Sequence, residues 1–444
     1  MTRSPMPLCR MALLVAGFAA AMPVAAETLQ DAWQRAENAS RSLKAETLRA
    51  EAAARGIEAA EAAAGPQVSA SAQWQKLDRE VRAVMDTSAL SAAMPAPVKA
   101  LFPGRIETPL TNDHPFNAEV KVTLPVYTAG RLDRLAGAAR EAERATRHGV
   151  ERARQDLRLD VAEAYVNVLR ANEAVSVATL YLSTLEAYRR DVGNYYRRGL
   201  VSRGDVSGAD VSVAEARQRL IAAREARVVA CAAFNRLTGR ALDASVTLTM
   251  LDLPRETRRF PELAALALQR RPELSQLQSM QAALAEEARG VKAEAMPQMG
   301  VFASYTYLDN PYLARKGVGA VGVGVKWDVF DSGLVRARAG GVERRAAALS
   351  EQRDDAATLI QLDVQRGVSQ EADAAERLNV ARAALESAQT WQDITLDRYH
   401  NGLANQTEVL MAAAKKADSQ KNLYNARFDH ALAILRLKRA IGEL

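Results

Sequence analysis

Tyr196-Arg197-Arg198-Gly199-Leu200, followed by Asp205-Val206, recurs 203 residues later as Tyr399-His400-Asn401-Gly402-Leu403, followed by Glu408-Val409. The same offset pairs the segment Leu124 to Gly130 with the segment Trp327 to Gly333. Solenoid repeats are about 20 to 50 residues long, so an offset of this size is too large for a solenoid. The sequence therefore predicts a duplicated half-protein, with one repeat over residues 27–254 and the other over residues 255–444.

Each half contains two stretches in which apolar and polar residues alternate. The apolar positions are Val68, Ala70, Ala72, Trp74, Ala118, Val120, Val122, Leu124 and Val126 in the first half, and Val301, Ala303, Tyr305, Tyr307, Val321, Val323, Val325 and Trp327 in the second. This period predicts strands near 67–75, 118–127, 299–307 and 319–330, each with one apolar and one polar face.

Strands of about ten residues with aromatic ends are typical of transmembrane barrels with a wet interior. A soluble sheet that packs its apolar face on helices has the same alternation, so both interpretations stay open at this point. The smallest spanning barrels have about eight strands, and four are too few to close one. If these strands cross a membrane, the protein has to oligomerise.

The longest predicted helices, over 131–198 and 334–399, contain no proline. In the first of them, apolar and small residues step alternately by four and three positions, at Leu157, Val161, Ala164, Val168, Ala171, Val175, Ala178, Leu182 and Leu185. This heptad seam is typical of helices that pack along their whole length, and 68 residues at 1.5 Å each make a helix of about 100 Å. The seam is looser in the second half, where Gly367 and Glu371 replace Ala164 and Val168.

Glycines end both long helices, at Gly199 and Gly402. Return helices are expected over 205–238 and 408–441. Each half also opens with an alanine-rich helical stretch, over 29–64 and 263–295, and a short connector over 240–261 joins the halves.

The first strand pair is interrupted by a longer connection than the second. Between residues 79 and 115 this connection carries Pro95, Pro97, Pro103, Pro109 and Pro115. These prolines exclude a long strand or helix there. We expect a surface loop that faces the outside of the cell.

The N-terminus predicts a secretory signal peptide over residues 1–26. Arg3 and Arg10 precede an apolar run of 11 residues, Met11 to Ala21, and small residues follow at the expected cleavage site. This run is shorter than the roughly 20 residues of a transmembrane helix, so we expect an exported protein without a spanning helix. Cys9 lies ahead of the apolar run, which leaves no lipid-anchor cysteine at the cleavage site, and Cys231 alone cannot form an intrachain disulfide.

Charge and motif content argue against several classes of function. The formal net charge is +6, and the Lys and Arg residues are interspersed with Asp and Glu, whereas nucleic-acid binding needs a basic stripe. The sequence has no glycine-rich phosphate loop and no metal-spaced set of His and Cys. The isolated histidines are His114, His148, His400 and His430. We therefore expect no enzyme, no catalytic residues, no cofactor, no metal site and no nucleic-acid partner.

Taken together, residues 27–444 closely resemble the TolC family of outer membrane channels. The resemblance rests on the paired strand-to-helix junctions, the paired Tyr-x-x-Gly-Leu turns, and the helix ends Leu237-Thr238-Gly239 and Ala440-Ile441-Gly442. It implies a mainly α fold with a small transmembrane β part: a homotrimer in outer membrane lipid whose subunits each give four strands to a 12-stranded barrel. The barrel continues as a long α-helical coiled-coil barrel across the periplasm.

The resemblance also implies a function. The protein would be the exit duct of a tripartite efflux pump or a type I secretion system in a Gram-negative bacterium. Its partners would be a periplasmic adaptor and an inner membrane transporter, and its periplasmic tip would open on contact with them.

Site residues follow from the same resemblance. Tyr399 matches a tyrosine that helps to hold the tip closed, and Asp205 matches its acidic partner. Glu408 matches the first of two aspartates in a constricting acidic ring. Met411 stands where the second aspartate falls, and Ala404 where the arginine of the other tip linkage falls, so both depart from the family. The candidate adaptor contacts are Gly199, Leu200, Gly402 and Leu403.

Ordinary structural roles are the alternatives for these residues, namely helix capping for Asp205 and Glu408, turn packing for Tyr399, and chain reversal for the glycines. Two other classes of protein are alternatives for the whole chain. A periplasmic adaptor has one helical hairpin and no membrane strands, and a secreted coiled-coil filament has no use for alternating strands with aromatic ends.

Overall fold

The computed structural model describes residues 26–99, 101 and 104–444. The predicted signal peptide, residues 1–26, lies outside these residues except for Ala26, and so does Pro103. The helices are α1 (Leu29–Ala39), α2 (Arg41–Ala62), α3 (Ser88–Ala93), α4 (Ala96–Lys99), α5 (Arg131–Arg197), α6 (Arg203–Thr238), α7 (Phe260–Arg270), α8 (Pro272–Ala293), α9 (Leu334–His400) and α10 (Gln406–Ala440). The strands are β1 (Gln67–Trp74), β2 (Arg82–Asp86), β3 (Arg105–Pro109), β4 (Phe116–Tyr127), β5 (Gln298–Asp309) and β6 (Gly317–Lys326).

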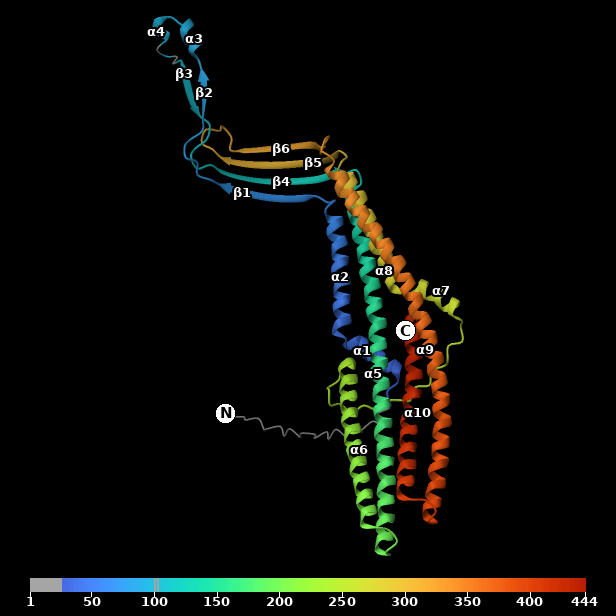
Figure 1. Cartoon of the computed structure of the whole chain (residues 1–444). Coiled ribbons are helices and arrows are strands. Elements are labelled where there is room, and N and C mark those ends of the chain that lie inside the picture. The colour runs from blue at the N-terminus through green and yellow to red at the C-terminus, as the bar shows by residue number, and fades with distance from the viewer. Residues whose placement is uncertain (1–25, 100, 102–103) are drawn as a thin grey trace, which may run out of the picture.

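The long helices form an elongated wall below the sheet (Figure 1). Helices α5 and α9 have 67 residues each, which corresponds to about 100 Å. Below the middle of the molecule α5 packs on α6 and α10, and α10 packs on α9; nearer the sheet, α8 lies between α5 and α9, and α2 lies on α5. Among the described residues, no helix is both long enough and apolar enough to cross a membrane.

The opening helical stretch of each half is broken in two, and the prediction of one continuous helix is wrong in both places. Ser40 has an extended backbone (φ −66°, ψ 114°), and its side chain accepts a hydrogen bond from the Leu43 N–H, so it starts a new helix. In the second half Arg271 is extended (φ −68°, ψ 119°) because it precedes Pro272, and proline disfavours the helical conformation in the residue before it.

The predicted heptad seam of α5 lies inside the wall. Leu157, Val161, Ala164, Val168, Ala171 and Leu185 are buried, and Val175, Ala178 and Leu182 are half-buried. The looser seam of α9 has a packing reason, because a Cβ atom at Gly367 would lie 3.0 Å from the Leu437 side chain of α10. The buried carboxylate of Glu371 lies 3.2 Å from His430 and 3.0 Å from Arg255.

The strand-to-helix junctions explain why the two seven-residue motifs match. Ala129 and Ser332 both have positive φ angles, of 49° and 54°, and so do the glycines that follow them, Gly130 and Gly333, at 79° and 84°. Left-handed backbone costs a non-glycine residue about 1–2 kcal/mol. The same costly reversal therefore joins a strand to a long helix at both positions.

The described part of the proline-rich segment between β1 and β4 contains no long strand or helix, as predicted, but it holds short elements where a loop was expected. Strands β2 and β3 pair as a short antiparallel ribbon, and the short helices α3 and α4 lie beyond it. Prolines are accepted at these places because Pro97 falls in the first turn of α4 and Pro109 at the end of β3.

The connector between the halves is fastened to the middle of the wall. The Tyr165 hydroxyl of α5 lies 2.8 Å from the Glu27 carbonyl oxygen and 2.7 Å from the Thr249 carbonyl oxygen. The Tyr165 ring is fully buried and packs edge-on against Phe234 of α6, with ring centroids 6.0 Å apart. This contact holds the start of the described chain and the connector on the same helix.

Arg258 joins the connector to Glu443, which follows α10. Its guanidinium donates to Glu256 at 2.9 and 2.7 Å and to Glu443 at 3.1 and 2.9 Å. The hydrogen bond from the Arg258 side chain lowers the pKa of Glu256 from its ordinary value of 4.5 to about 2.

Acid is therefore expected to weaken this part of the wall. A carboxyl whose folded-state pKa is depressed stabilises the fold above its unfolded pKa, and that contribution is lost as the pH falls from 4.5 towards about 2. We expect the melting temperature of Arg258→Gln, followed by circular dichroism, to fall less steeply over this pH range than that of the unchanged protein. The neighbouring exposed Arg259→Gln is the control, and equal pH dependence in both variants would contradict the assignment.

Candidate functional site

Strands β1, β4, β5 and β6 form one antiparallel sheet in that order. Its register confirms the predicted alternation, because Val68 pairs with Val122, Val122 with Ala303, and Ala303 with Val321. The residues of this apolar face include Ala70, Ala72, Trp74, Phe116, Ala118, Val120, Leu124, Val301, Tyr305, Tyr307 and Val323. One continuous apolar face therefore crosses all four strands.

No described residue covers this apolar face. Val321 is 87% exposed, and Val68, Val120, Tyr305 and Val323 are exposed as well. The sheet extends beyond the ends of the helices rather than lying on them (Figure 1). The alternative of a soluble sheet that packs its apolar face on its own helices is therefore wrong.

The opposite face of the sheet is mainly polar or small, and its large apolar residues are Phe302, Leu308 and Val318. It carries Gln67, Ser69, Ser71, Gln73, Asn117, Glu119, Lys121, Thr123, Ser304 and Thr306. The ring of Phe302 lies on this face over Gly322, where a Cβ atom would come within 2.9 Å of the ring, and the Lys121 ammonium lies 5.8 Å from the ring centroid. Gly322 thus leaves room for the Phe302 ring, which lies between this glycine and the Lys121 side chain's charge on the polar face.

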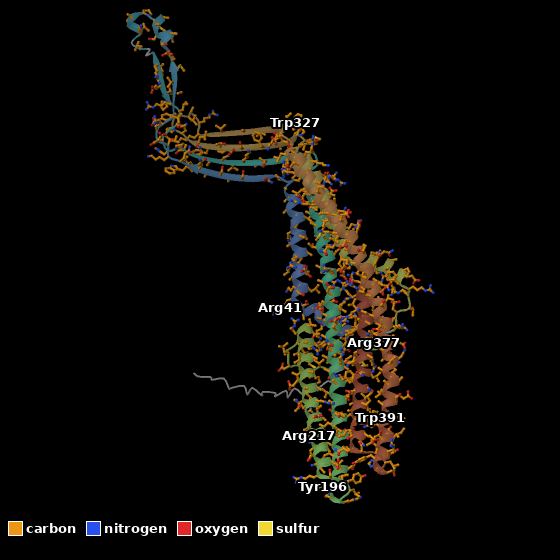
Figure 2. All side chains as sticks on the ribbon, viewed as in Figure 1. Arg41, Tyr196, Arg217, Trp327, Arg377 and Trp391 are labelled. Carbon is orange, nitrogen blue, oxygen red and sulfur yellow. The ribbon has the colours of Figure 1, made fainter. Side chains whose placement is uncertain are left out.

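Both outer edges of the sheet are open. Strand β1 pairs only with β4 and strand β6 only with β5 in the described part of the chain. An open edge presents a row of unpaired N–H and C=O groups, which is a template for pairing with another chain. Trp327 lies at the end of the sheet where it meets the helices, and its indole N–H donates to the Ala295 carbonyl at 3.1 Å (Figure 2).

At the other end of the wall, two helix–turn–helix tips reverse the chain in the same way. Gly199 and Gly402 have φ angles of 71° and 74°. The N–H of Leu200 bonds to the Tyr195 carbonyl at 3.0 Å, and that of Leu403 bonds to the Arg398 carbonyl at 2.7 Å. Each hydrogen bond closes a Schellman-type cap at the C-terminus of the helix, in which the residue after the helix has a positive φ and is therefore usually glycine.

The leucines of the tips are not used for packing. In this kind of cap the residue after the glycine usually touches the last helical turn through an apolar contact. Here Leu200 is 67% and Leu403 is 68% exposed. Each tip therefore presents one apolar side chain to the outside. Tyr196, labelled in Figure 2, marks the tip of the first half.

Tyr399 is the centre of an aromatic cluster between the two tips. Its ring centroid lies 5.6 Å from that of Tyr188 and 5.9 Å from that of Tyr195, both on α5, and 6.2 Å from that of His400. The Tyr195 hydroxyl lies 3.4 Å from Nδ1 of His400. Burial raises the pKa of the hydroxyls of Tyr188 and Tyr399.

Asp205 caps helix α6. Its carboxylate accepts hydrogen bonds from the N–H and the hydroxyl of Ser202, both at 2.8 Å, and the hydroxyl bond is the larger cause of its lowered pKa. In the described chain no hydrogen bond joins Asp205 to Tyr399. The tips are linked instead by Gln406, whose amide donates to the Asp205 carbonyl oxygen at 2.9 Å.

Glu408 stands in the first turn of α10, where its N–H donates to the Asn405 side chain at 3.0 Å. Its side chain is half-buried, while Met411, one turn further along, is exposed. Ala404 lies in the turn itself and is half-buried. The resemblance identified Glu408, Asp205 and Tyr399 but not Tyr188, Tyr195 or Gln406, which only the packing of the hairpins brings together.

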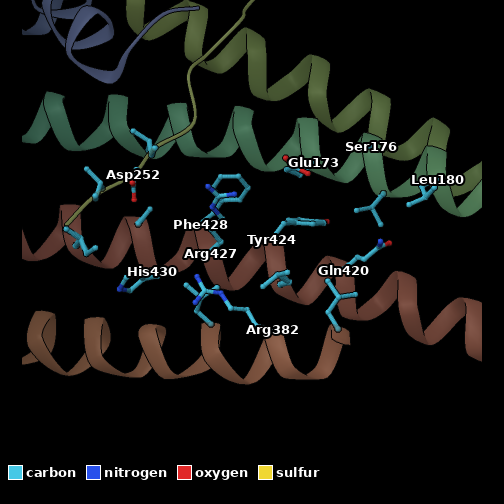
Figure 3. A pocket seen from close by; sticks show the side chains of 18 residues that line it. Glu173, Ser176, Leu180, Asp252, Arg382, Gln420, Tyr424, Arg427, Phe428 and His430 are labelled. Carbon is cyan, nitrogen blue, oxygen red and sulfur yellow. The ribbon is translucent and has the colours of Figure 1, made fainter. Parts of the chain in front are cut away.

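A pocket of about 580 Å³ lies between α5, α9, α10 and the connector (Figure 3). Its lining combines apolar side chains with charged ones, the acidic Glu173 and Asp252 and the basic Arg382 and Arg427. Ser176 and His430 lie at opposite ends of it in Figure 3. This serine and this histidine are thus not placed as a nucleophile and its base. Within the described residues, no group of three or more His, Cys, Asp or Glu is placed to hold a metal ion.

Comparison with known proteins identifies relatives of this architecture. A sequence model of the outer membrane efflux protein family matches residues 32–240 and 263–443. Outer membrane protein TolC of Escherichia coli (strain K12) is 23% identical over 323 residues, and alkaline protease secretion protein AprF of Pseudomonas aeruginosa is 22% identical over 298 residues. Each alignment covers 65% of this chain and 62% of the relative, so the chain spans less than two thirds of the length of either.

A solved structure has a similar fold along most of its length. The outer membrane protein VceC of Vibrio cholerae aligns with a TM-score of 0.73 and 18% identity, over 93% of this chain and 96% of that chain. At this identity the similarity concerns the fold.

Proposed function

Because the chain belongs to the outer membrane efflux protein family, we propose that it is the exit duct of a tripartite efflux pump or a type I secretion system. It is an outer membrane protein, and its family consists of channel proteins rather than enzymes. The duct takes substrates from an inner membrane transporter and passes them out of the cell. Its partners are a second and a third copy of itself, a periplasmic adaptor, the transporter and outer membrane lipid.

The observation that carries this proposal is the sheet with an uncovered apolar face and two open edges. Three copies that pair β6 of one with β1 of the next close a barrel of 12 strands, which leaves no backbone group unpaired in lipid. The apolar face then meets the lipid, and the face with Lys121 and Thr123 lines a wet interior.

The helical wall continues the barrel across the periplasm. The two halves, which have the same order of helices and sheet strands, are two structural repeats, and three subunits give six repeats around one axis. A periplasmic adaptor is the alternative function, but a chain with two hairpins and a sheet whose apolar face is open fits it poorly.

The tips form the periplasmic gate. The Tyr399 cluster and the bond from Gln406 to Asp205 hold the hairpin of the second half against that of the first. Three Glu408 carboxylates around the axis attract cations and repel anions. The outward leucines, Leu200 and Leu403, with the glycines before them, contact the adaptor.

Membrane fractionation tests the proposal. We expect the protein in the outer membrane fraction, as an oligomer that survives mild detergent and dissociates on heating, and as a cation-selective channel in planar lipid bilayers. A soluble periplasmic monomer would refute the proposal. AprF is named for protease secretion, so co-expression with candidate adaptors and transporters, read out as export of a protease or of a small dye, distinguishes the two kinds of system.

The gate makes a separate prediction. Tyr399→Ala removes the ring that joins the hairpins, so single-channel conductance should rise severalfold, and Glu408→Ala should raise it and lower cation selectivity. Tyr196→Ala is the matched control, because Tyr196 occupies the equivalent position in the other half and is exposed. Unchanged conductance in both Tyr399→Ala and Glu408→Ala would remove these residues from the gate while leaving the channel intact.

A further inference from the structure

The short ribbon of β2 and β3 projects from the end of the sheet that lies farthest from the helices (Figure 1). It continues the pair β1 and β4, because the Leu77 N–H still bonds to the Asp113 carbonyl at 2.7 Å beyond the last paired residues of the sheet. The Asn310 side chain, from the turn between β5 and β6, donates to the Leu110 carbonyl at 2.6 Å. The base of the ribbon is thus fastened to the second half of the chain.

The register gives the ribbon two unlike faces. Ala83 pairs with Thr108, and Met85 pairs with Ile106. Val81 and Leu110 extend the same face by one step, since the Leu110 N–H bonds to the Val81 carbonyl at 2.7 Å. All six of these side chains are uncharged, and four of them are large and apolar.

The opposite face carries the charges of the ribbon. Arg82, Asp86, Arg105 and Glu107 lie on it, together with Val84. Arg82 and Arg105 pair with Glu107 at 3.8 and 3.3 Å. This face is suited to water, which leaves the other face as the one that needs a partner.

Nothing in the described chain covers the uncharged face. Met85 is 64% exposed, and Val81, Ile106 and Leu110 are exposed as well. An isolated two-stranded ribbon is marginally stable in water at best, because stable sheets need a third strand or a packed face. The described part of the chain therefore lacks the cover that this ribbon needs.

The charge of the segment selects the kind of cover. Between residues 75 and 115 the chain carries five basic and five acidic side chains, Lys76, Arg79, Arg82, Lys99, Arg105, Asp78, Glu80, Asp86, Glu107 and Asp113. A balanced segment has no net attraction to an anionic lipid surface or to a strongly charged protein. An uncharged face matches another uncharged face, and the nearest such face is the same ribbon on the next subunit.

We propose that the uncharged face of the β2–β3 ribbon is a contact surface for a second copy of this chain, and that three ribbons pack together and narrow the outer mouth of the channel. This inference rests on the proposed function, since it needs subunits arranged around one axis. The ribbon starts beside the edge strand β1, where the next subunit joins the barrel. The duct then has two constrictions. The first is the gate at the periplasmic tips, made by the Tyr399 cluster and the Glu408 carboxylates, and the second is the outer mouth, made by apolar contacts between ribbons.

Cysteine cross-linking tests the contact. In full-length protein with Cys231→Ala, Met85→Cys should form a disulfide between subunits in oxidised outer membranes, giving a dimer band on denaturing gels with at most two chains linked per trimer. Val84→Cys is the matched control, because Val84 is the next residue, is 52% exposed and lies on the charged face. It should stay unlinked and react freely with a maleimide. A third variant, Met85→Asp, should raise the conductance without changing the oligomer.

The outcomes separate this inference from the proposed function. A heat-modifiable oligomer in which the Met85→Cys variant does not cross-link, and reacts with maleimide as fast as the Val84→Cys variant, overturns the ribbon contact and leaves the channel standing. A second outcome also overturns the ribbon contact. If a fluorescent dye on the thiol of the Met85→Cys variant is quenched by spin-labelled lipid, the uncharged face of the ribbon lies against the membrane and not against another subunit. A monomer in the same preparation overturns the channel as well.

Discussion

Val321→Arg is expected to abolish most of the assembled oligomer in the outer membrane. Val321 lies on the edge strand β6, on the apolar face, and is 87% exposed in the single chain. An arginine on the lipid face of a transmembrane barrel costs about 2–4 kcal/mol near the middle of the bilayer. Since each subunit carries the change, three such costs would fall on the proposed trimeric barrel.

The matched control is the preceding residue. Ala320 pairs with Ser304, so it belongs to the polar face of the same strand and is also exposed. Ala320→Arg should assemble nearly as well as the unchanged protein and alter only the ion selectivity. The comparison is made from the heat-modifiable band of outer membrane preparations and from urea unfolding in liposomes. Equal loss in both variants would contradict the assignment of the faces.

Arg439→Met is expected to destabilise the helical wall strongly. Arg439 is buried, and its guanidinium donates to Asp156 of α5 at 2.9 and 2.6 Å and to Glu273 of α8 at 2.9 Å. Arg271 also bonds to Glu273, at 3.0 Å. Burial raises the pKa of the Glu273 carboxyl. The hydrogen bond from Arg439 and the positive charge of Arg271 outweigh this effect, so the pKa of Glu273 is lowered overall.

Breaking a buried ion pair from one side costs about 3–5 kcal/mol, because the remaining charge stays buried without its partner. Arg271 still faces Glu273, so we expect the lower end of that range. Arg436→Met is the control. Arg436 pairs with Glu163 at 2.7 Å on the exposed surface, where such pairs contribute about 0–1 kcal/mol. Urea unfolding monitored by circular dichroism measures both, and similar midpoints for the two variants would contradict the prediction.

The parts of the fold with a regular period could be predicted from the sequence. The four sheet strands and the long helices repeat one pattern over many residues, and the observed ends of α5, α6, α9 and α10 differ from the expected ones by no more than two residues. The break at Ser40 could not be predicted, because serine occurs inside helices as well as at their caps. The break at Arg271 does have a signal in the sequence, since Pro272 disfavours the helical conformation in the residue before it.

The ribbon of β2 and β3 was missed for a different reason. Its strands are five residues each, and the prolines around them signal irregular chain. In the sequence of β2, apolar Val84 interrupts the alternation of apolar residues with Arg82 and Asp86, so the pattern does not distinguish a short strand from a loop.

The candidate gate could be predicted only in part. The turns locate Tyr399, Asp205 and Glu408, since they repeat from one half to the other. Tyr188 and Tyr195 lie on α5, and each precedes Tyr399 by more than 200 residues. No local pattern in the sequence indicates that these rings meet. Contacts between distant helices depend on how the hairpins pack, which is a property of the folded wall.

The seven-residue spacing along α5 has a consequence for the reach of the molecule. Seven residues advance a helix by two turns and about 10 Å while almost preserving the direction of every side chain. Suppose that seven residues are removed at the same level from both helices of each hairpin. The buried side chains of the two helices would still face each other. Deleting or inserting such a unit in both helices of every hairpin would therefore change the length of the helical wall by about 10 Å at a time and leave the sheet and the tips as they are.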